Sequence, residues 1–303
     1  MNRVAVLGSA NADLVVEVPR RPAGGETLLG SDLHVFAGGK GANQAAAAAR
    51  SGASTSFHAC VGRDENGEVV RSRLVEAGVA VEGIVTVDRP TGTALILVTP
   101  DGENSIVVSP GANQALDVGH AEATADQWSN ADVLVLNLET PRETVERVAA
   151  MAAERGVRVL LNAAPAEQVS SVTLAVCDPL VVNEHEARAL LEDDGNSSFA
   201  RLAERFLDLG VRSVVITLGA AGALYGDRNG IDTVPSFRVP VVDTTGAGDA
   251  FVGATACELA AGTPLRDAVA FASAVAALSV QRMGAQSSYP DRRQVEAWLA
   301  ERG

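Results

Sequence analysis

The chain has 303 residues, 47% of them hydrophobic, and carries a formal net charge of −14 at pH 7. This length and hydrophobic content allow one large α/β domain with a sizeable core. The acidic excess argues against nucleic acid and anionic membranes as partners, because such a surface repels polyanions. The three cysteines, Cys60, Cys177 and Cys257, lie far apart in apolar runs, which predicts buried thiols and no disulfide framework or metal-ligand spacing.

No targeting or membrane-spanning segment is expected. The first ten residues, MNRVAVLGSA, lack the apolar stretch of a signal peptide. The longest apolar run, around 268–280, falls short of the roughly 18 residues that a membrane-spanning helix needs, and it predicts a buried helix. We therefore expect a cytoplasmic protein.

The first third of the chain predicts one buried strand and then a small separate sheet. Residues 4–9, VAVLGS, form a continuous apolar run typical of a parallel strand. A helix is expected from about residue 41 to 50. The small sheet, from about 11–36 and 90–100, is predicted to cover the ends of the main strands as a lid. Segments 14–18, 26–30 and 34–38, separated by proline and glycine, are typical of antiparallel strands. Segments 93–98 and 104–109 are also strand-like and are joined by a turn signal.

From residue 131 onward, predicted strands and helices alternate. Strands are expected at DVLVLNL, VRVLLN, PLVVN and VRSVVITLG, with GALYG and GIDTVPSF as a hairpin at the sheet edge. Long helices are expected at about 247–261, 264–283 and 291–302. The alternation predicts an α/β fold: a three-layer, doubly wound, mostly parallel sheet in one domain over residues 1–303, with the lid inserted in it. Such sheets bind ligands outside the carboxyl ends of their strands.

The segment DTTGAGDAF, residues 243–251, combines a glycine turn with two acids ahead of an alanine-rich helix. The backbone N–H groups of Gly246, Ala247 and Gly248 would face an anion at the helix start. Asp249, in the first helical turn, is a candidate general base beside this anion hole. The alternative is an ordinary acid at a helix N-terminus. Asp243 is expected at a strand end, where it could bind a cation.

Two motifs in the first 50 residues suit recognition of hydroxyl groups. In GSANAD, residues 8–13, Asn11 and Asp13 would share one face of an extended segment and bind vicinal hydroxyls. In GGKGANQAA, residues 38–46, the glycines allow close backbone approach, and Lys40 and Asn43 could reach a ligand hydroxyl. The second motif lacks the Walker A pattern. A polar turn and a plain helix start are the alternatives.

Two further motifs follow predicted strands, at the strand ends where such a sheet would bind its ligand. TLGAAGA, residues 217–223, could hold phosphates through backbone N–H groups, although a lone G-x-x-G is weak evidence. In VVNEHE, residues 181–186, Asn183 and Glu186 could touch waters bound to Mg²⁺. The alternative is a helix capping box formed by the same two residues. The four histidines are scattered without metal-ligand spacing.

Taken together, these motifs resemble the PfkB carbohydrate kinase family, and most closely its ribokinase branch. The resemblance covers nearly the whole chain. GGKGANQA and DTTGAGD correspond to the two family signatures, in order and about 200 residues apart. The other matching segments are GSANAD, VGRDENG (61–67), TGTALI (91–96), GAN (111–113), VVNEHE, TLGAAGA and RMGAQSS (282–288).

The resemblance implies a Rossmann-like kinase domain whose β lid often forms a homodimer, and MgATP-dependent phosphorylation of D-ribose at its 5-hydroxyl. Asp249 would be the base, and Glu186 would order Mg²⁺ through water. The implied sugar-binding residues are Asn11, Asp13, Gly39, Lys40, Gly41, Asn43, Glu139 and Asp249. The implied nucleotide-binding residues are Asn183, Thr217, Gly219, Gly222, Gly248 and Ser273. A K⁺ ion would lie near Asp243, Thr245, Ser279, Arg282, Gly284 and Ser288.

One departure and three alternatives accompany this interpretation. Ser273 stands where the family often has a larger polar residue near the adenine. The acceptor could instead be 2-deoxyribose, another pentose, fructose or a nucleoside. An inactive sugar or nucleotide sensor is disfavoured because Asp249 and its glycines are intact. A dinucleotide oxidoreductase is disfavoured because GSANAD lacks G-x-G-x-x-G.

Overall fold

The fold was obtained as a computed structural model, which describes residues 2–101 and 104–302. Within these residues, one sheet has nine strands in the order β13-β12-β11-β10-β9-β8-β1-β4-β5. All of its neighbouring strands pair in parallel, except β11 with β12 and β12 with β13. The strands are β1 (Arg3–Leu7), β4 (Ser54–Gly62), β5 (Ala80–Val87), β8 (Val133–Asn137), β9 (Arg158–Asn162), β10 (Cys177–Asn183), β11 (Ser213–Thr217), β12 (Ala223–Asp227) and β13 (Gly230–Val234).

Helices cover both faces of this sheet, which makes three layers and confirms the predicted fold class. Along β8, Val133 and Val135 belong to the core on one face, and Leu134 and Leu136 belong to the core on the other. The first face packs against α1 (Lys40–Arg50), α2 (Glu65–Glu76), α9 (Ala247–Ala260), α10 (Leu265–Ser279) and α11 (Arg292–Ala300). The second packs against α3 (Val118–Ala123), α4 (Ala125–Trp128), α5 (Arg142–Glu154), α7 (Glu184–Leu190) and α8 (Phe199–Asp208); α6 (Ser171–Val176) connects β9 to β10.

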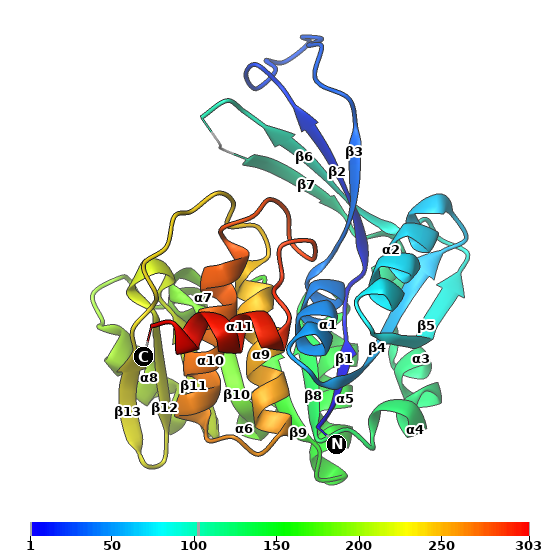
Figure 1. Cartoon of the computed structure of the whole chain (residues 1–303). Helices are drawn as coiled ribbons and strands as arrows, with labels where there is room; N and C mark the ends of the chain where they lie inside the picture. The colour runs from blue at the N-terminus through cyan, green and yellow to red at the C-terminus, as the bar shows by residue number, and fades with distance from the viewer. Residues whose placement is uncertain (1, 102–103, 303) are drawn as a thin grey trace.

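A separate small sheet rises above the strand ends of the large one (Figure 1). Its order in the described chain is β3-β2-β6-β7, with β2 paired in parallel to β6 and the other pairs antiparallel. The strands are β2 (Asn11–Glu17), β3 (His34–Gly38), β6 (Gly92–Val98) and β7 (Asn104–Ser109). We call this sheet the lid.

Two local predictions were wrong. Residues 26–30 form no strand. They belong to an irregular loop, in which the Ser31 N–H donates to the carbonyl of Glu17 at 2.9 Å and the side chain of Leu29 is 92% exposed. The helix expected over 264–283 ends at Ser279, because the chain turns there and the carbonyl of Val280 accepts the N–H groups of Val242 and Asp243.

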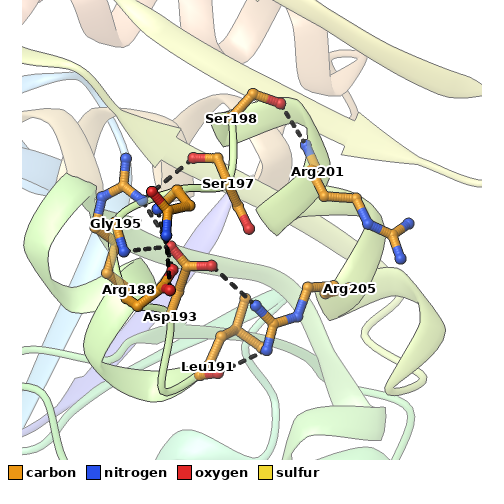
Figure 2. A network of polar contacts seen from close by, with 10 residues as sticks. Arg188, Leu191, Asp193, Gly195, Ser197, Ser198, Arg201 and Arg205 are labelled. Atoms are coloured by element: carbon orange, nitrogen blue, oxygen red, sulfur yellow. Dashed lines mark hydrogen bonds and ion pairs between the residues drawn. The ribbon is translucent and has the colours of Figure 1, made fainter.

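An ion-pair network fixes the connection between α7 and α8 (Figure 2). The carboxylate of Asp193, only 4% exposed, accepts hydrogen bonds from Arg188 at 2.7 Å and Arg205 at 3.2 Å. Arg205 also donates to the carbonyl of Leu191 at 2.6 Å. Since Arg188 lies on α7, the network braces the helix whose N-terminus reaches the strand ends. No helix among the described residues is long and apolar enough to cross a bilayer.

Candidate active site

Two adjoining hollows lie where the parallel strands of the large sheet end. The smaller, about 160 Å³, is lined by residues that include Lys40, Asn183, Glu186 and Asp249. The larger, about 440 Å³, lies between the β11–β12 turn, the loop before α9, and α10. Both are lined by Thr217 and Gly248, so they meet beside the first turn of α9.

The start of α9 places unbonded backbone N–H groups beside a carboxylate. Gly246 adopts the left-handed conformation at φ 72°, and a Cβ there would lie 2.5 Å from the hydroxyl oxygen of Tyr289. Tyr289 donates that hydroxyl to the carbonyl of Gly246 at 3.0 Å and fixes the turn. The N–H groups of Gly246, Gly248 and Asp249 have no hydrogen-bond acceptor in the described chain. Of the three predicted anion-hole N–H groups, that of Ala247 is occupied, since it donates to the Thr244 carbonyl at 3.2 Å. Free donors therefore remain at the helix start.

Asp249 is buried, and both of its carboxylate oxygens accept hydrogen bonds. Asn43 Nδ2 lies 3.0 Å from Oδ2, and Gln44 Nε2 lies 2.9 Å from Oδ1. Burial raises the pKa of Asp249, while the charge of Lys40 and these two hydrogen bonds oppose the rise. Lys40 is partly buried. Desolvation lowers its pKa, but the charges of Asp249, Glu139 and Glu186 raise the pKa by more, so the ammonium stays charged.

Asp13 projects from the lid strand β2 toward this centre. A Cβ on Gly38, its neighbour on β3, would lie 2.1 Å from the carboxylate, so the motif needs glycine at that position. The Asp13 carboxylate accepts no hydrogen bond that the described residues provide. Burial, followed by the charges of Glu139 and Asp249, raises its pKa to about 7. Such a carboxylate is ready to accept hydrogen bonds from a ligand.

The other residues predicted to bind sugar surround Asp13. Asn11 Oδ1 accepts a hydrogen bond from Asn113 at 2.7 Å. Glu139 Oε2 accepts from the Ser9 hydroxyl at 2.6 Å and from the backbone N–H of Lys40 at 3.0 Å, which ties β1, α1 and the end of β8 together.

The glycines of GGKG allow this close assembly. Gly39 has φ 86°, a conformation that favours glycine. A Cβ at Gly41 would lie 2.7 Å from the backbone of Gly8 and Ser9, so α1 begins in direct backbone contact with the turn after β1.

All of the predicted nucleotide-binding residues except Asn183, which lines the smaller hollow, line the larger hollow. These are Thr217, Gly219, Gly222, Gly248 and Ser273, and the wall is largely apolar, with Phe237, Val239 and Ala276. Gly222 has φ 102°, and a Cβ there would lie 2.1 Å from the carbonyl oxygen of Val234. Ser273 turns its hydroxyl to the carbonyl of Val269 at 2.8 Å, within its own helix.

Asn183 and Glu186 form the capping box that stood as the alternative to a ligand role. Asn183 Oδ1 accepts the N–H of Glu186 at 2.8 Å, and Glu186 Oε2 accepts the N–H of Asn183 at 2.8 Å. Both residues nevertheless line the smaller hollow. Burial raises the pKa of Glu186, partly offset by the Asn183 N–H and by Lys40. One carboxylate oxygen of Glu186 therefore remains available to a ligand.

The residues predicted near K⁺ come together from two loops. Asp243 Oδ1 accepts from the Thr245 N–H and hydroxyl at 2.9 and 2.7 Å, and Oδ2 accepts from the Gly284 N–H at 2.8 Å. Although burial raises the pKa of Asp243, these hydrogen bonds lower it overall. The hydroxyls of Ser279 and Ser288 donate to nearby carbonyls, and Arg282 is exposed. Over residues 2–101 and 104–302, no group of three or more His, Cys, Asp or Glu could hold a metal.

Comparison with known proteins decides the family. Residues 1–292 match the model of the pfkB family of carbohydrate kinases. The chain belongs to this family. It is 40% identical to a ribokinase of Haemophilus influenzae over 98% of each chain. Two solved structures are also similar, both with a TM-score of 0.92. One is a ribokinase of Thermotoga maritima (37% identity, 99% of this chain and 100% of that chain), and the other is a ribokinase of Arabidopsis thaliana complexed with ribose and ATP (32% identity, 98% of each chain).

In this carbohydrate kinase, sequence reasoning missed the amide side chains behind the predicted site. Gln44 and Asn162 lie beside Asp249, Asn113 supports Asn11, and Gln286 contacts Asn43. Gln44 and Asn113 lay inside quoted motifs, GGKGANQA and GAN, so a search for polar residues at buried motif positions would have found them. Asn162 ends a strand beside the crevice, and that position was its signal.

Replacing Asp13 by asparagine should stabilise the free kinase, and more so at pH 8 than at pH 5. In the folded state the pKa of Asp13 is raised to about 7, so the folded chain holds this proton more tightly than the unfolded chain does. The contribution of Asp13 to stability is therefore lost as the pH rises from about 4 to about 7. Urea unfolding should show a gain of roughly 1–4 kcal/mol at pH 8. The exposed Asp32, changed to asparagine, is the control. Equal gains for Asp13→Asn at both pH values would contradict this prediction.

Proposed function

We propose that this carbohydrate kinase transfers the γ-phosphoryl group of ATP to the 5-hydroxyl of D-ribose. The observation that carries the proposal is the position of Asp249. It lies beside free N–H groups at a helix start, next to the larger hollow on one side and the hydroxyl-binding residues of the lid on the other. The ribokinase relatives, one of them complexed with ribose and ATP, support this choice of substrates.

The proposed chemistry depends on positioning and charge. Phosphoryl transfer requires an acceptor hydroxyl in line with the γ-phosphate, and little covalent help from the protein. Asp249 would accept the proton of the 5-hydroxyl as that oxygen attacks. The N–H groups of Gly248 and Asp249, with that of Ala247 if its turn opens, would stabilise charge on the phosphoryl oxygens. Lys40 supplies a partly buried positive charge beside them.

The sugar would be held between the lid and α1. Asn11, Asp13 and Glu139 present oxygen acceptors to ring hydroxyls, and Lys40 and Asn43 present donors. The lid lies over the strand ends and would exclude water, which otherwise competes with the sugar as acceptor (Figure 1). The apolar wall around Phe237 suits the adenine ring, and the turn from Gly219 to Gly222 would follow the phosphates.

Mg²⁺ fits the smaller hollow. Glu186 offers a carboxylate oxygen there, and a buried carboxylate with a raised pKa gains from a nearby cation. Mg²⁺ usually retains several waters, so Glu186 would hold it through water. When bound, the ion would neutralise charge on the phosphates of ATP.

K⁺ would belong to the paired loops behind the anion hole. The loops 243–245 and 279–288 are joined by hydrogen bonds from Gly284 to Asp243 and from Val242 to Val280. Oxygens of Asp243, Thr245, Ser279, Arg282, Gly284 and Ser288 are the proposed ligands. A cation there would hold the turn at Gly246.

A homodimer through the lid also belongs to the proposal, in a cytoplasmic enzyme formed by a single domain. The register places Val35, Leu14, Leu95 and Val107 in one row across the lid. Val35, Leu95 and Val107 are 41%, 51% and 65% exposed. An exposed apolar row of this kind suits burial against a second copy. Sedimentation that detects only the monomer would refute the dimer.

Asp249→Asn should lower kcat by at least about a hundredfold, because the amide cannot accept the hydroxyl proton. Affinities for ribose and ATP, measured by calorimetry, should change little. The matched control is Asp267→Asn, an exposed acid in the first turn of the next helix, and it should retain full activity. Near-normal turnover in Asp249→Asn would remove Asp249 from the role of base.

A coupled kinase assay over a sugar panel tests the substrate. Ribose should exceed 2-deoxyribose in kcat/KM by a factor on the order of 10² or more, because Asn11 and Asp13 are left unpaired when a hydroxyl is missing. Equal efficiency with 2-deoxyribose, or a preference for fructose or a nucleoside, would overturn ribose as the substrate.

The same assay with Na⁺ in place of K⁺ should be slower. An unchanged rate would remove the proposed K⁺ site.

A further inference from the structure

A chain of amide side chains leads from the sheet to the carboxylate of Asp249. Asn162, at the end of β9, donates from Nδ2 to the carbonyl of Val181 at 3.2 Å. Its Oδ1 accepts from Gln44 Nε2 at 2.9 Å, and the same nitrogen donates to Asp249 Oδ1 at 2.9 Å. Gln44 is fully buried.

The direction of this chain is fixed by the backbone. A carbonyl only accepts, so the Val181 carbonyl requires the NH₂ group of Asn162 to face it. Asn162 Oδ1 then faces Gln44 and requires its NH₂ group. The two hydrogens of Gln44 Nε2 are thereby assigned, one to Asn162 and one to Asp249. Gln44 cannot rotate its amide by half a turn without losing both bonds.

A second amide chain reaches the other carboxylate oxygen. Gln286, from the loop after α10, donates from Nε2 to Asn43 Oδ1 at 3.0 Å. This contact turns Asn43 Nδ2 toward Asp249 Oδ2, at 3.0 Å. One N–H of Asn43 remains for a ligand. Asp249 is thus held from both sides, by donors on α1 whose orientation is set by β9 and by the loop after α10.

We propose that Gln44 and Gln286 are positioning residues for Asp249, which fix the plane of its carboxylate and keep it ionised. Each carboxylate oxygen has two lone pairs, and one amide donor on each leaves the remaining lone pairs for the sugar hydroxyl. Hydrogen bonds to a charged acceptor favour the charged form, and they offset the burial that raises the pKa of Asp249. An ionised Asp249 can accept a proton, and a neutral one cannot.

The side-chain oxygens of the two glutamines have no hydrogen-bond donor among the residues described, which indicates that these residues serve as donors and do not merely fill space. Gln44 Oε1 and Gln286 Oε1 are buried, and no described group donates to them. A buried acceptor without a partner is unfavourable for folding, and an apolar side chain of the same shape would avoid that cost. The directed N–H groups are therefore the feature of these side chains that the site uses.

The test is to remove the donor of Gln44 and follow the titration of Asp249. The variants are Gln44→Met, which keeps the length without N–H groups, and Gln44→Glu, which puts a second carboxyl beside Asp249. Carboxyl ¹³C NMR of aspartate-labelled protein, with the Asp249 signal assigned from Asp249→Asn, gives the midpoint directly. It should rise by about one pH unit in Gln44→Met and further in Gln44→Glu. Gln127→Met, on the exposed side of α4, should leave it unchanged.

A folded Gln44→Met protein whose Asp249 titrates at the wild-type midpoint would overturn the proposal. If Gln44→Met does not fold, Gln286→Met serves in its place, with a smaller upward shift expected because it frees only the orientation of Asn43. An unchanged midpoint there would likewise overturn it.

The catalytic consequence rests on the proposed function, whereas the titration does not. In the kinase assay, the acid limb of the kcat profile should move upward with the NMR midpoint. A wild-type protein without sugar kinase activity would refute the proposed function and leave the titration result standing. Lower kcat at every pH with an unmoved acid limb would contradict the positioning role.

Discussion

The close contact between α1 and α9 is the constraint on which the rest of the site depends. A Cβ at Gly253 on α9 would lie 2.4 Å from the carbonyl oxygen of Gln44 and 2.6 Å from the Cβ of Ala47. The facing run of α1, from Ala45 to Ala48, is almost completely buried. Only glycine and alanine allow helix backbones to approach this far. The approach places Asn43 and Gln44 within hydrogen-bond distance of Asp249, one turn before Gly253.

The same close packing brings several carboxylates together beside the N–H groups that we propose bind ATP. The carboxylates of Glu139, Glu186 and Asp249 lie near the ammonium of Lys40, and Asp13 lies near Glu139 and Asp249. Burial, followed by the charges of Glu139 and Asp249, raises the pKa of Asp13 to about 7. In the proposed function, binding of ATP therefore depends on Lys40 and on uncharged N–H groups at the start of α9, while the amides from α1 keep Asp249 ionised.

How far the sequence could predict this fold depends on local signals. The strands after residue 131 were found because apolar runs alternate with amphipathic helices, and the edge hairpin β12–β13 was found from its glycine turns. The segment 26–30 is apolar enough to suggest a strand, but no described strand pairs with it and it folds as a loop. The helix α10 ends at Ser279, because the carbonyl of Val280 accepts the N–H groups of Val242 and Asp243. Both outcomes depend on contacts across distant parts of the chain.

The candidate site was likewise predicted only where a local motif marks it. The motifs predicted Lys40, Asn43 and Asp249 from charged or amide side chains close to glycines, and Asp13 from its position beside Asn11 in GSANAD. Asn183 and Glu186 fit both a ligand role and a capping box, and the structure shows the capping box on the wall of the hollow.

Gln44 and Gln286 lie inside the motifs GGKGANQA and RMGAQSS, and Asn162 ends a strand, but their roles were missed because their contacts join positions more than 100 residues apart in the sequence.

The most direct test of the α1–α9 contact is the kcat of Gly253→Ala. A methyl group at this position must move the helices apart, which should cost about 1–3 kcal/mol of stability. A displacement near 1 Å at the reacting groups should lower kcat by up to about 100-fold. Gly119→Ala, in the exposed helix α3, adds the same methyl group where its close neighbour is the exposed Asp117 carboxylate, at 3.3 Å, and it should keep full activity. A folded Gly253→Ala enzyme with wild-type kcat would contradict the account.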